Sequence, residues 1–221
     1  MLKKFVATMM VLSCVAVVMA DAEIDVALVP VDTSAAAGYT DVAVDPATWV
    51  AAGYLCYDLQ VTVHGSTDSW TTASGNATMT GGEFWNHPSG GDTQPNTNNF
   101  AYFGLMRFDS FWCSAEEWPN PDLNTGANAT TFAPGSPSVQ TATQRNAEWY
   151  SDPLDPTAYG GTYTIARYTF LPTGSWSLTV SGNTYVASTG GNPHPYSVTV
   201  TPEPASLALL ALGGLAFFRR R

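Results

Sequence analysis

The sequence predicts a mainly β protein, with one β-sandwich or jelly-roll-like domain that carries long loops. Short segments with alternating apolar and polar residues recur along the body, as in Tyr196, Val198 and Val200. Gly, Pro, Asn and Thr punctuate these segments, and helical periodicity is hard to find between them. This pattern is typical of antiparallel strands with one buried and one solvated face.

The expected strands follow from this alternation in chain order. They cover residues 24–31, 53–64, 76–80, 100–112, 162–171, 175–181, 184–188 and 196–201. Ser181-Gly182-Asn183 lies between two of these segments and predicts a tight hairpin turn. Two insertions rich in Gly, Pro, Asn, Thr and Ser, residues 81–99 and 114–146, are expected to be long loops.

The N-terminus has the three parts of a secretory signal peptide. Lys3 and Lys4 precede an apolar run that ends in small residues. We expect residues 1–20 to be removed by signal peptidase after export through the Sec machinery, with cleavage between Ala20 and Asp21 or two residues later. A lipoprotein signal ending at Cys14 is the alternative, but the apolar run continues beyond that cysteine.

The C-terminus combines three blocks in a fixed order. Pro202-Glu203-Pro204 precedes the uncharged apolar run 205–218, and Arg219, Arg220 and Arg221 close the chain. A helix of this run would be roughly 21 Å long, shorter than the ~30 Å hydrocarbon core, so a buried core helix is an alternative to a transmembrane helix. The almost wholly apolar surface and the terminal arginines favour a helix in membrane lipid, with its C-terminus in the cytoplasm.

These C-terminal blocks resemble the PEP-CTERM sorting signal of exported bacterial proteins. The resemblance covers about residues 201–221 only, and the chain divides into a signal peptide (1–20), an exported domain (21–200) and this segment. It implies recognition by an exosortase, a membrane-embedded enzyme that cleaves near the tripeptide. It further implies at least transient anchoring, followed by delivery to the cell surface or extracellular matrix.

The charged residues of the body are very unevenly divided. The whole chain has 18 acidic and 8 basic residues and a net charge of −10. Without the two signals the body retains only Arg107, Arg145 and Arg167 as basic residues, and no lysine. Nucleic acid is excluded as a partner because phosphate binding requires clustered Lys and Arg. An acidic surface suits a soluble exported domain or one that meets divalent cations.

Two cysteines remain after the signal peptide, Cys56 and Cys113. An even number in an oxidising compartment favours a disulfide, and both residues fall on the more polar side of their expected strands. We therefore predict a Cys56–Cys113 bridge, which would stabilise the domain by about 4 kcal/mol in the chain-entropy picture.

Enzyme motifs are not found in the sequence, and we expect neither catalytic residues nor a cofactor. Gly-x-Ser-x-Gly, the phosphate-binding Gly-Lys-Ser/Thr loop and His-Glu-x-x-His do not occur. Scattered loop carboxylates leave open a structural Ca²⁺ ion, and a secreted hydrolase would need two of them in one cleft.

Loop aromatics give an alternative function to that of a surface or matrix protein. The faces of Trp85, Trp118 or Trp149 could stack on sugars, which would make the domain a carbohydrate-binding module for exopolysaccharide. Core packing is the competing explanation for these residues.

Overall fold

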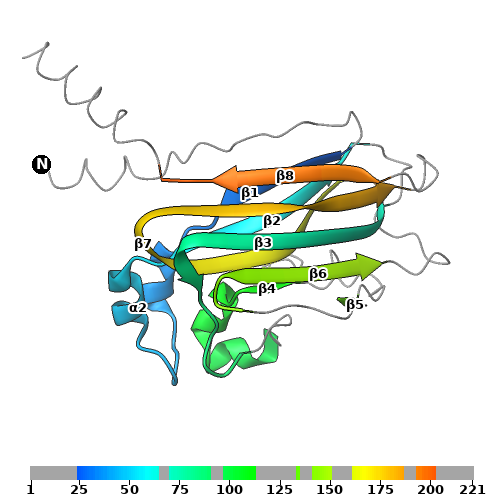
Figure 1. Cartoon of the computed structure of the whole chain (residues 1–221). Coiled ribbons are helices and arrows are strands. Elements are labelled where there is room, and N and C mark those ends of the chain that lie inside the picture. Colours follow the sequence, from blue (N-terminus) through cyan, green and yellow to red (C-terminus); the bar gives the residue numbers. More distant parts are fainter. Residues whose placement is uncertain are drawn as a thin grey trace, which may run out of the picture.

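The strands form one antiparallel sheet in the order β1-β2-β7-β3-β6-β5, with β4 and β8 also paired to β7 (Figure 1). The computed structural model describes residues 24–64, 70–90, 97–112, 133–134, 141–150, 161–186 and 193–202. The mainly β class is confirmed. The separate sheets of a sandwich or jelly roll are not confirmed, because the described strands belong to one hydrogen-bonded sheet.

The elements have the following bounds. The strands are β1 (Ile24–Pro30), β2 (Leu55–Val63), β3 (Trp70–Phe84), β4 (Phe111–Trp112), β5 (Ala133–Pro134), β6 (Gln144–Tyr150), β7 (Gly161–Val186) and β8 (His194–Val200). The helices are the 3-10 helices η1 (Ser34–Gly38), η2 (Thr97–Ala101) and η3 (Gly104–Phe108), and the α-helix α2 (Pro46–Ala52).

Strand β7 bends sharply and thereby folds the sheet over. Its first half pairs with β2, up to Leu55 opposite Phe170, and with residues 82–84 at the end of β3. Its second half pairs with the rest of β3 and with β8. At the bend Gly174 has φ +69°, a left-handed conformation that glycine adopts without steric cost. The two halves therefore contribute to different parts of the sheet, as the turn of the yellow and gold ribbon shows (Figure 1).

The main core lies between the parts of the sheet that meet at this bend. One cluster unites buried side chains of β1, β2, β3, β4, β7 and β8, including Leu28, Leu59, Met79, Ile165 and Val198. In β2 the inward residues alternate as the sequence predicts. Burial of this apolar surface is the main stabilising contribution to the fold.

A helical layer covers the outer side of β2. Trp49 of α2 and Leu105 and Phe108 of η3 form a second cluster with Cys56. Helix α2 was not predicted, although its end signals are present: Asp45 accepts a hydrogen bond from the Thr48 amide at 3.1 Å, and Pro46 is the first helical residue. This layer buries residues of β2 that a two-sided sheet would leave in water.

Three sequence-based expectations are wrong. Residues 100–112 form the end of η2, the helix η3 and the short β4 rather than one strand. Residues 81–84 and 144–146 belong to β3 and β6 rather than to long loops. Gly182 lies within the second half of β7, opposite Gly75 and Tyr196, rather than in a hairpin turn. A Cβ at Gly182 would come within 1.9 Å of the Ser74 carbonyl oxygen, so this glycine permits a close backbone approach.

The predicted signal peptide, the Ala20/Asp21 cleavage site and the apolar run 205–218 lie outside the described residues. Within the described ranges, the structure contains no helix of sufficient length and apolarity to cross a membrane.

Candidate functional site

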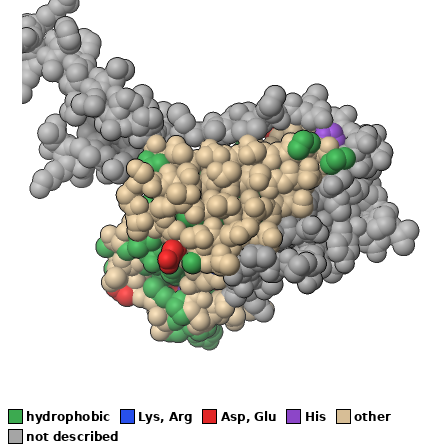
Figure 2. All heavy atoms as spheres, viewed as in Figure 1, with side chains coloured by type: hydrophobic (Ala, Val, Ile, Leu, Met, Phe, Trp, Pro, Cys, Tyr) green, Lys and Arg blue, Asp and Glu red, His purple; other side chains and the backbone are tan. Residues whose placement is uncertain are grey.

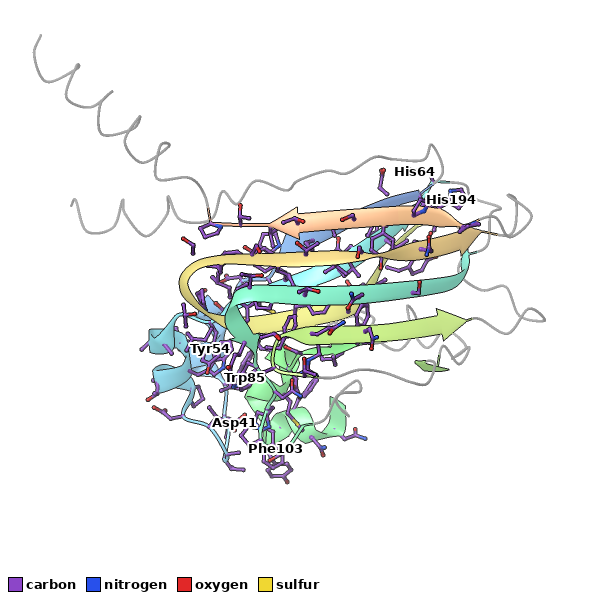
Figure 3. The ribbon with its side chains drawn as sticks, viewed as in Figure 1. Asp41, Tyr54, His64, Trp85, Phe103 and His194 are labelled. Atoms are coloured by element: carbon purple, nitrogen blue, oxygen red, sulfur yellow. The ribbon has the colours of Figure 1, made fainter. Side chains whose placement is uncertain are left out.

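Four aromatic side chains from three segments pack together in and beside the helical layer. Trp49 of α2 stacks on Tyr54 with ring centroids 4.9 Å apart and an interplanar angle of 4°. Trp85, which follows β3, lies 5.4 Å from Trp49 and 5.7 Å from Tyr54, and Phe108 lies 5.2 Å from Trp49. Trp49 is buried, whereas Tyr54 and Trp85 are partly exposed. Figure 3 shows Tyr54 and Trp85 close together. The two partly exposed rings form the aromatic surface of this cluster.

The backbone at Trp85 is fixed on both sides. Its amide donates to the Thr169 carbonyl at 2.7 Å, and its carbonyl accepts from the Ser110 amide at 3.2 Å. The segment 85–90 is thus attached to β7 and to the residue before β4. This attachment gives the Trp85 ring a defined position.

His87 is the centre of the segment 85–90 and is fully buried. Its Nε2 lies 3.0 Å from Oδ2 of Asp41, and its Nδ1 accepts a hydrogen bond from the Ser89 amide at 3.0 Å. Since Nδ1 is an acceptor, the proton is on Nε2 and is donated to Asp41. Both ring nitrogens are therefore used within the fold, and neither has a lone pair available as a general base.

The Asp41 carboxylate joins three segments of the chain. Its Oδ1 accepts from the amides of Ala43 and Val44, both at 2.9 Å, and its Oδ2 accepts from the Leu105 amide at 3.0 Å as well as from His87. Burial acts to raise the pKa of Asp41, but these backbone donors and His87 together hold it below the ordinary value. A charged Asp41 thus connects η3 and the segment 85–90 to its own loop.

A second buried carboxylate, that of Asp109, binds the backbone of the segment 85–90. Its Oδ1 accepts from the amides of His87 and Ser110, both at 2.9 Å. A Cβ on Gly90 would meet Asp109 Oδ2 at 1.9 Å, so glycine allows the chain to approach the carboxylate. Sequence analysis did not identify Asp41, His87 or Asp109 as a group, because they are far apart in the chain.

The three arginines of the body all bind within the fold. Arg167 forms a bidentate pair with Asp58, and Arg145 donates to Asn86 at 2.7 Å. The guanidinium carbon of Arg107 lies 4.5 Å from the centre of the Phe100 ring. Figure 2 shows no basic side chain on the face in view. The described part of the chain therefore has no cluster of basic side chains for an anionic polymer.

The predicted sugar-stacking residues are only partly visible. Trp85 belongs to the aromatic cluster, and the side chain of Trp149 and the whole of Trp118 lie outside the described residues. By its backbone, Trp149 pairs with Ala73 near the start of β3, whereas Trp85 follows the end of β3. Trp85 and Trp149 are therefore at opposite ends of that strand and do not share one site.

Cys56 is a free, buried thiol in the structure. Burial raises its pKa to about 12. The predicted Cys56–Cys113 bridge is not confirmed, and Cys113 lies outside the described residues.

Metal ligands do not gather within the described ranges. No group of three or more His, Cys, Asp or Glu side chains is suitably arranged there. His64 and Asp25 form an exposed pair, with Nε2 and Oδ2 2.6 Å apart, at the end of the strands away from the aromatic cluster (Figure 3).

Comparison with known proteins identifies the C-terminal segment. Residues 200–221 match the family model described as the PEP-CTERM protein-sorting motif. The expected resemblance is confirmed, including Pro202-Glu203-Pro204 and the three terminal arginines within the matched range. The protein is therefore of the exported class that is sorted at the membrane towards the cell envelope, with an exosortase-type enzyme as its processing partner.

No curated protein matches the sequence. Among solved structures, the chain is similar to a DUF4466 family protein from Parabacteroides merdae ATCC 43184, at 8% identity and a TM-score of 0.29. The alignment covers 79% of this chain and 42% of that one. A TM-score this low carries no argument about fold or function.

Proposed function

We propose that this protein is a non-enzymatic β domain displayed at the cell surface or in the extracellular matrix. A signal peptide and the Sec machinery export it, its C-terminal helix holds it in the membrane, and an exosortase-like enzyme then processes it. The main support is the position of the sorting motif: the match begins at Val200, the last residue of β8.

The described part of the chain reaches the protein surface directly after β8. Val200 is buried in the core, whereas Thr201 and Pro202 are exposed. Five residues lead from Val200 to Ala205, where the apolar run starts, and they span at most about 17 Å. While the run is in lipid, the folded body would thus remain close to the membrane, with the tripeptide outside the sheet.

A non-enzymatic role is supported by the buried polar side chains, which form hydrogen bonds within the fold. His87 is hydrogen-bonded at both ring nitrogens, and the three arginines bind within the fold. Asp41 and Asp109 hold backbone amides in place, which is a structural role.

The sorting role is tested by deleting residues 202–221 and following the protein by cell fractionation and intact mass. We expect the deletion to move the protein from the envelope to the periplasm or medium. A matched variant replaces Arg219, Arg220 and Arg221 by Gln, which retains the tripeptide and apolar run but removes the cationic stop. Unchanged envelope association of the deletion variant would refute the proposal.

Sugar binding at the aromatic cluster is a second candidate. It is favoured by the partly exposed rings of Tyr54 and Trp85, which lie side by side 5.7 Å apart. Replacing Tyr54 by Ser should abolish retardation in polysaccharide gels if these rings stack on exopolysaccharide. Retardation equal to that of the unmodified protein would exclude this site.

A further inference from the structure

The outer surface of β3, the second half of β7 and β8 carries a regular array of small polar side chains. β3 and β7 each contribute three alternate residues that point away from the core, and β8 together with the residue after it contributes three more. All nine are partly or fully exposed. They are Asn76, Thr78 and Thr80 of β3, Ser177, Thr179 and Ser181 of β7, and Ser197, Thr199 and Thr201 of β8 and its end.

The strand register aligns these residues in rows across the sheet. Thr78 is opposite Thr179, and Thr179 is opposite Thr199, so the central row consists of three threonines. The Oγ1 atoms of Thr179 and Thr199 are 2.9 Å apart. Neighbouring strands are about 4.8 Å apart, and alternate residues along a strand are about 7 Å apart. The hydroxyl groups therefore repeat in two directions.

The residues between them fix the array from below. Met79, Leu178, Val180 and Val198 point into the main core and are no more than 3% exposed. Because these inward side chains set the register, the outward threonines occupy fixed positions. The array, defined by the nine residues above, is a preformed surface.

The array contains no charged residue. Solvent-facing surfaces of proteins usually carry interspersed Lys, Arg, Asp and Glu side chains. This chain has 18 acidic residues, and none of them belongs to the array. Figure 2 shows this face as an area of uncharged polar side chains and backbone, with the acidic side chains in view lying beyond it. An uncharged area is poorly suited to an ionic polymer, and its small polar side chains are poorly suited to an apolar partner.

The side chains of the array offer the contacts that sugars require. Each threonine presents a hydroxyl group, which both donates and accepts, next to a methyl group. Sugar rings likewise present hydroxyl groups next to C–H groups. Since the face lacks charge while the protein carries −10, acidic polysaccharides would be repelled and neutral ones would not.

We propose that this array binds uncharged polysaccharide chains laid across β3, β7 and β8. Each hydrogen bond replaces one to water and adds little, so affinity should rise with the length of the polysaccharide. This function goes beyond sorting at the membrane, and its site is separate from Tyr54 and Trp85.

The test is native gel electrophoresis of the full chain, purified in mild detergent, through gels that contain a soluble neutral glucan. We use hydroxyethyl cellulose as the neutral polymer and alginate as the acidic one. The proposal predicts retardation by the glucan, stronger for longer chains, and none by alginate. Replacing Thr78, Thr179 and Thr199 together by Val keeps the β-branched shape, removes the central hydroxyl row and should weaken binding about tenfold or more.

The matched control lies on another part of the sheet. Thr62 and Thr162 also pair across strands with their Oγ1 atoms 2.9 Å apart. Replacing both by Val makes the same chemical change outside the array and should leave retardation unchanged, with the fold of each variant checked by its unfolding midpoint.

Three outcomes would overturn the proposal: no retardation by the glucan, equal loss in the array and control variants, or retardation that depends on Tyr54 instead of the threonines. The assay uses purified protein, so its failure leaves the sorting proposal intact.

Discussion

Asp58 and Arg167 face each other across β2 and β7 and form a buried bidentate ion pair. The Nε–Oδ1 and Nη2–Oδ2 distances are 2.7 and 2.8 Å, and the side chains of Arg167 and Asp58 are only 9% and 11% exposed. Arg167 Nη1 also donates to the Arg107 carbonyl of η3. The pair thus joins the sheet to the helical layer that covers it.

Removal of one partner should be costly because the other charge would remain buried. Arg167→Met is expected to lower the free energy of unfolding by about 3–5 kcal/mol, measured by urea denaturation. The double variant Asp58→Leu/Arg167→Met leaves no unpaired charge and should recover most of this loss. If the double variant were as unstable as Arg167→Met, the cost would come from lost packing and not from the unpaired carboxylate.

Asp41 should stabilise the fold only while it is ionised. Its folded-state pKa is lowered, so its contribution is present above the unfolded-state pKa of about 4 and is lost as the pH falls through the folded-state value. We expect Asp41→Asn to cost about 2 kcal/mol at pH 7, and this difference from the unmodified protein to shrink in acid. Urea denaturation at a series of pH values measures it.

Asp32 provides the control for that experiment. It accepts from the Ser34 amide at 2.8 Å, but it is exposed. Asp32→Asn should change stability by less than about 0.5 kcal/mol at pH 7. A pH-independent effect of Asp41→Asn would show that the charge of Asp41 is not what connects the segments.

The strands could be predicted from the sequence where every second residue points into the core, because apolar and polar residues then alternate. In β2, the inward positions of Tyr57, Leu59 and Val61 follow directly from the alternation. The outward residues Cys56 and Asp58 look solvated in the sequence, yet both are buried. Their burial depends on α2 and η3, which cover the outer face of β2 through tertiary packing. The sequence of β2 alone therefore cannot predict it.

For residues 100–112 the sequence indicates burial correctly but predicts the wrong secondary structure. Phe100, Met106 and Phe111 form a small buried cluster, which makes the segment rich in apolar residues whatever its secondary structure. A short apolar run cannot distinguish a buried strand from a buried helix by periodicity alone. The candidate site was hidden for a similar reason: Asp41 and His87 are 46 residues apart, and only the fold brings them together.

The thiol of Cys56 should be unreactive in the native protein. With its pKa raised to about 12, almost no thiolate exists at pH 8, and the side chain is 2% exposed. A maleimide reagent should label Cys56 only after denaturation, without a reductant, as resolved by peptide mass analysis. Labelling that requires a reductant would instead support the disulfide with Cys113.

Gly182 should tolerate no side chain, because it lies within a paired part of β7 with the Ser74 carbonyl where a Cβ would be. Gly182→Ala is expected to lower the free energy of unfolding by about 2–3 kcal/mol, since backbone cannot move aside easily. Gly182→Asn separates this position from a hairpin turn: Asn suits the left-handed residues of tight turns, but here it should be at least as harmful as Ala. Gly38→Ala is the control, because a Cβ there meets nothing within 4 Å and should cost no stability. If Gly182→Asn were more stable than Gly182→Ala, residues 175–181 and 184–188 would be two strands joined by a turn at Gly182. The strand register that aligns Thr78, Thr179 and Thr199 would then be wrong, because it depends on a continuous β7.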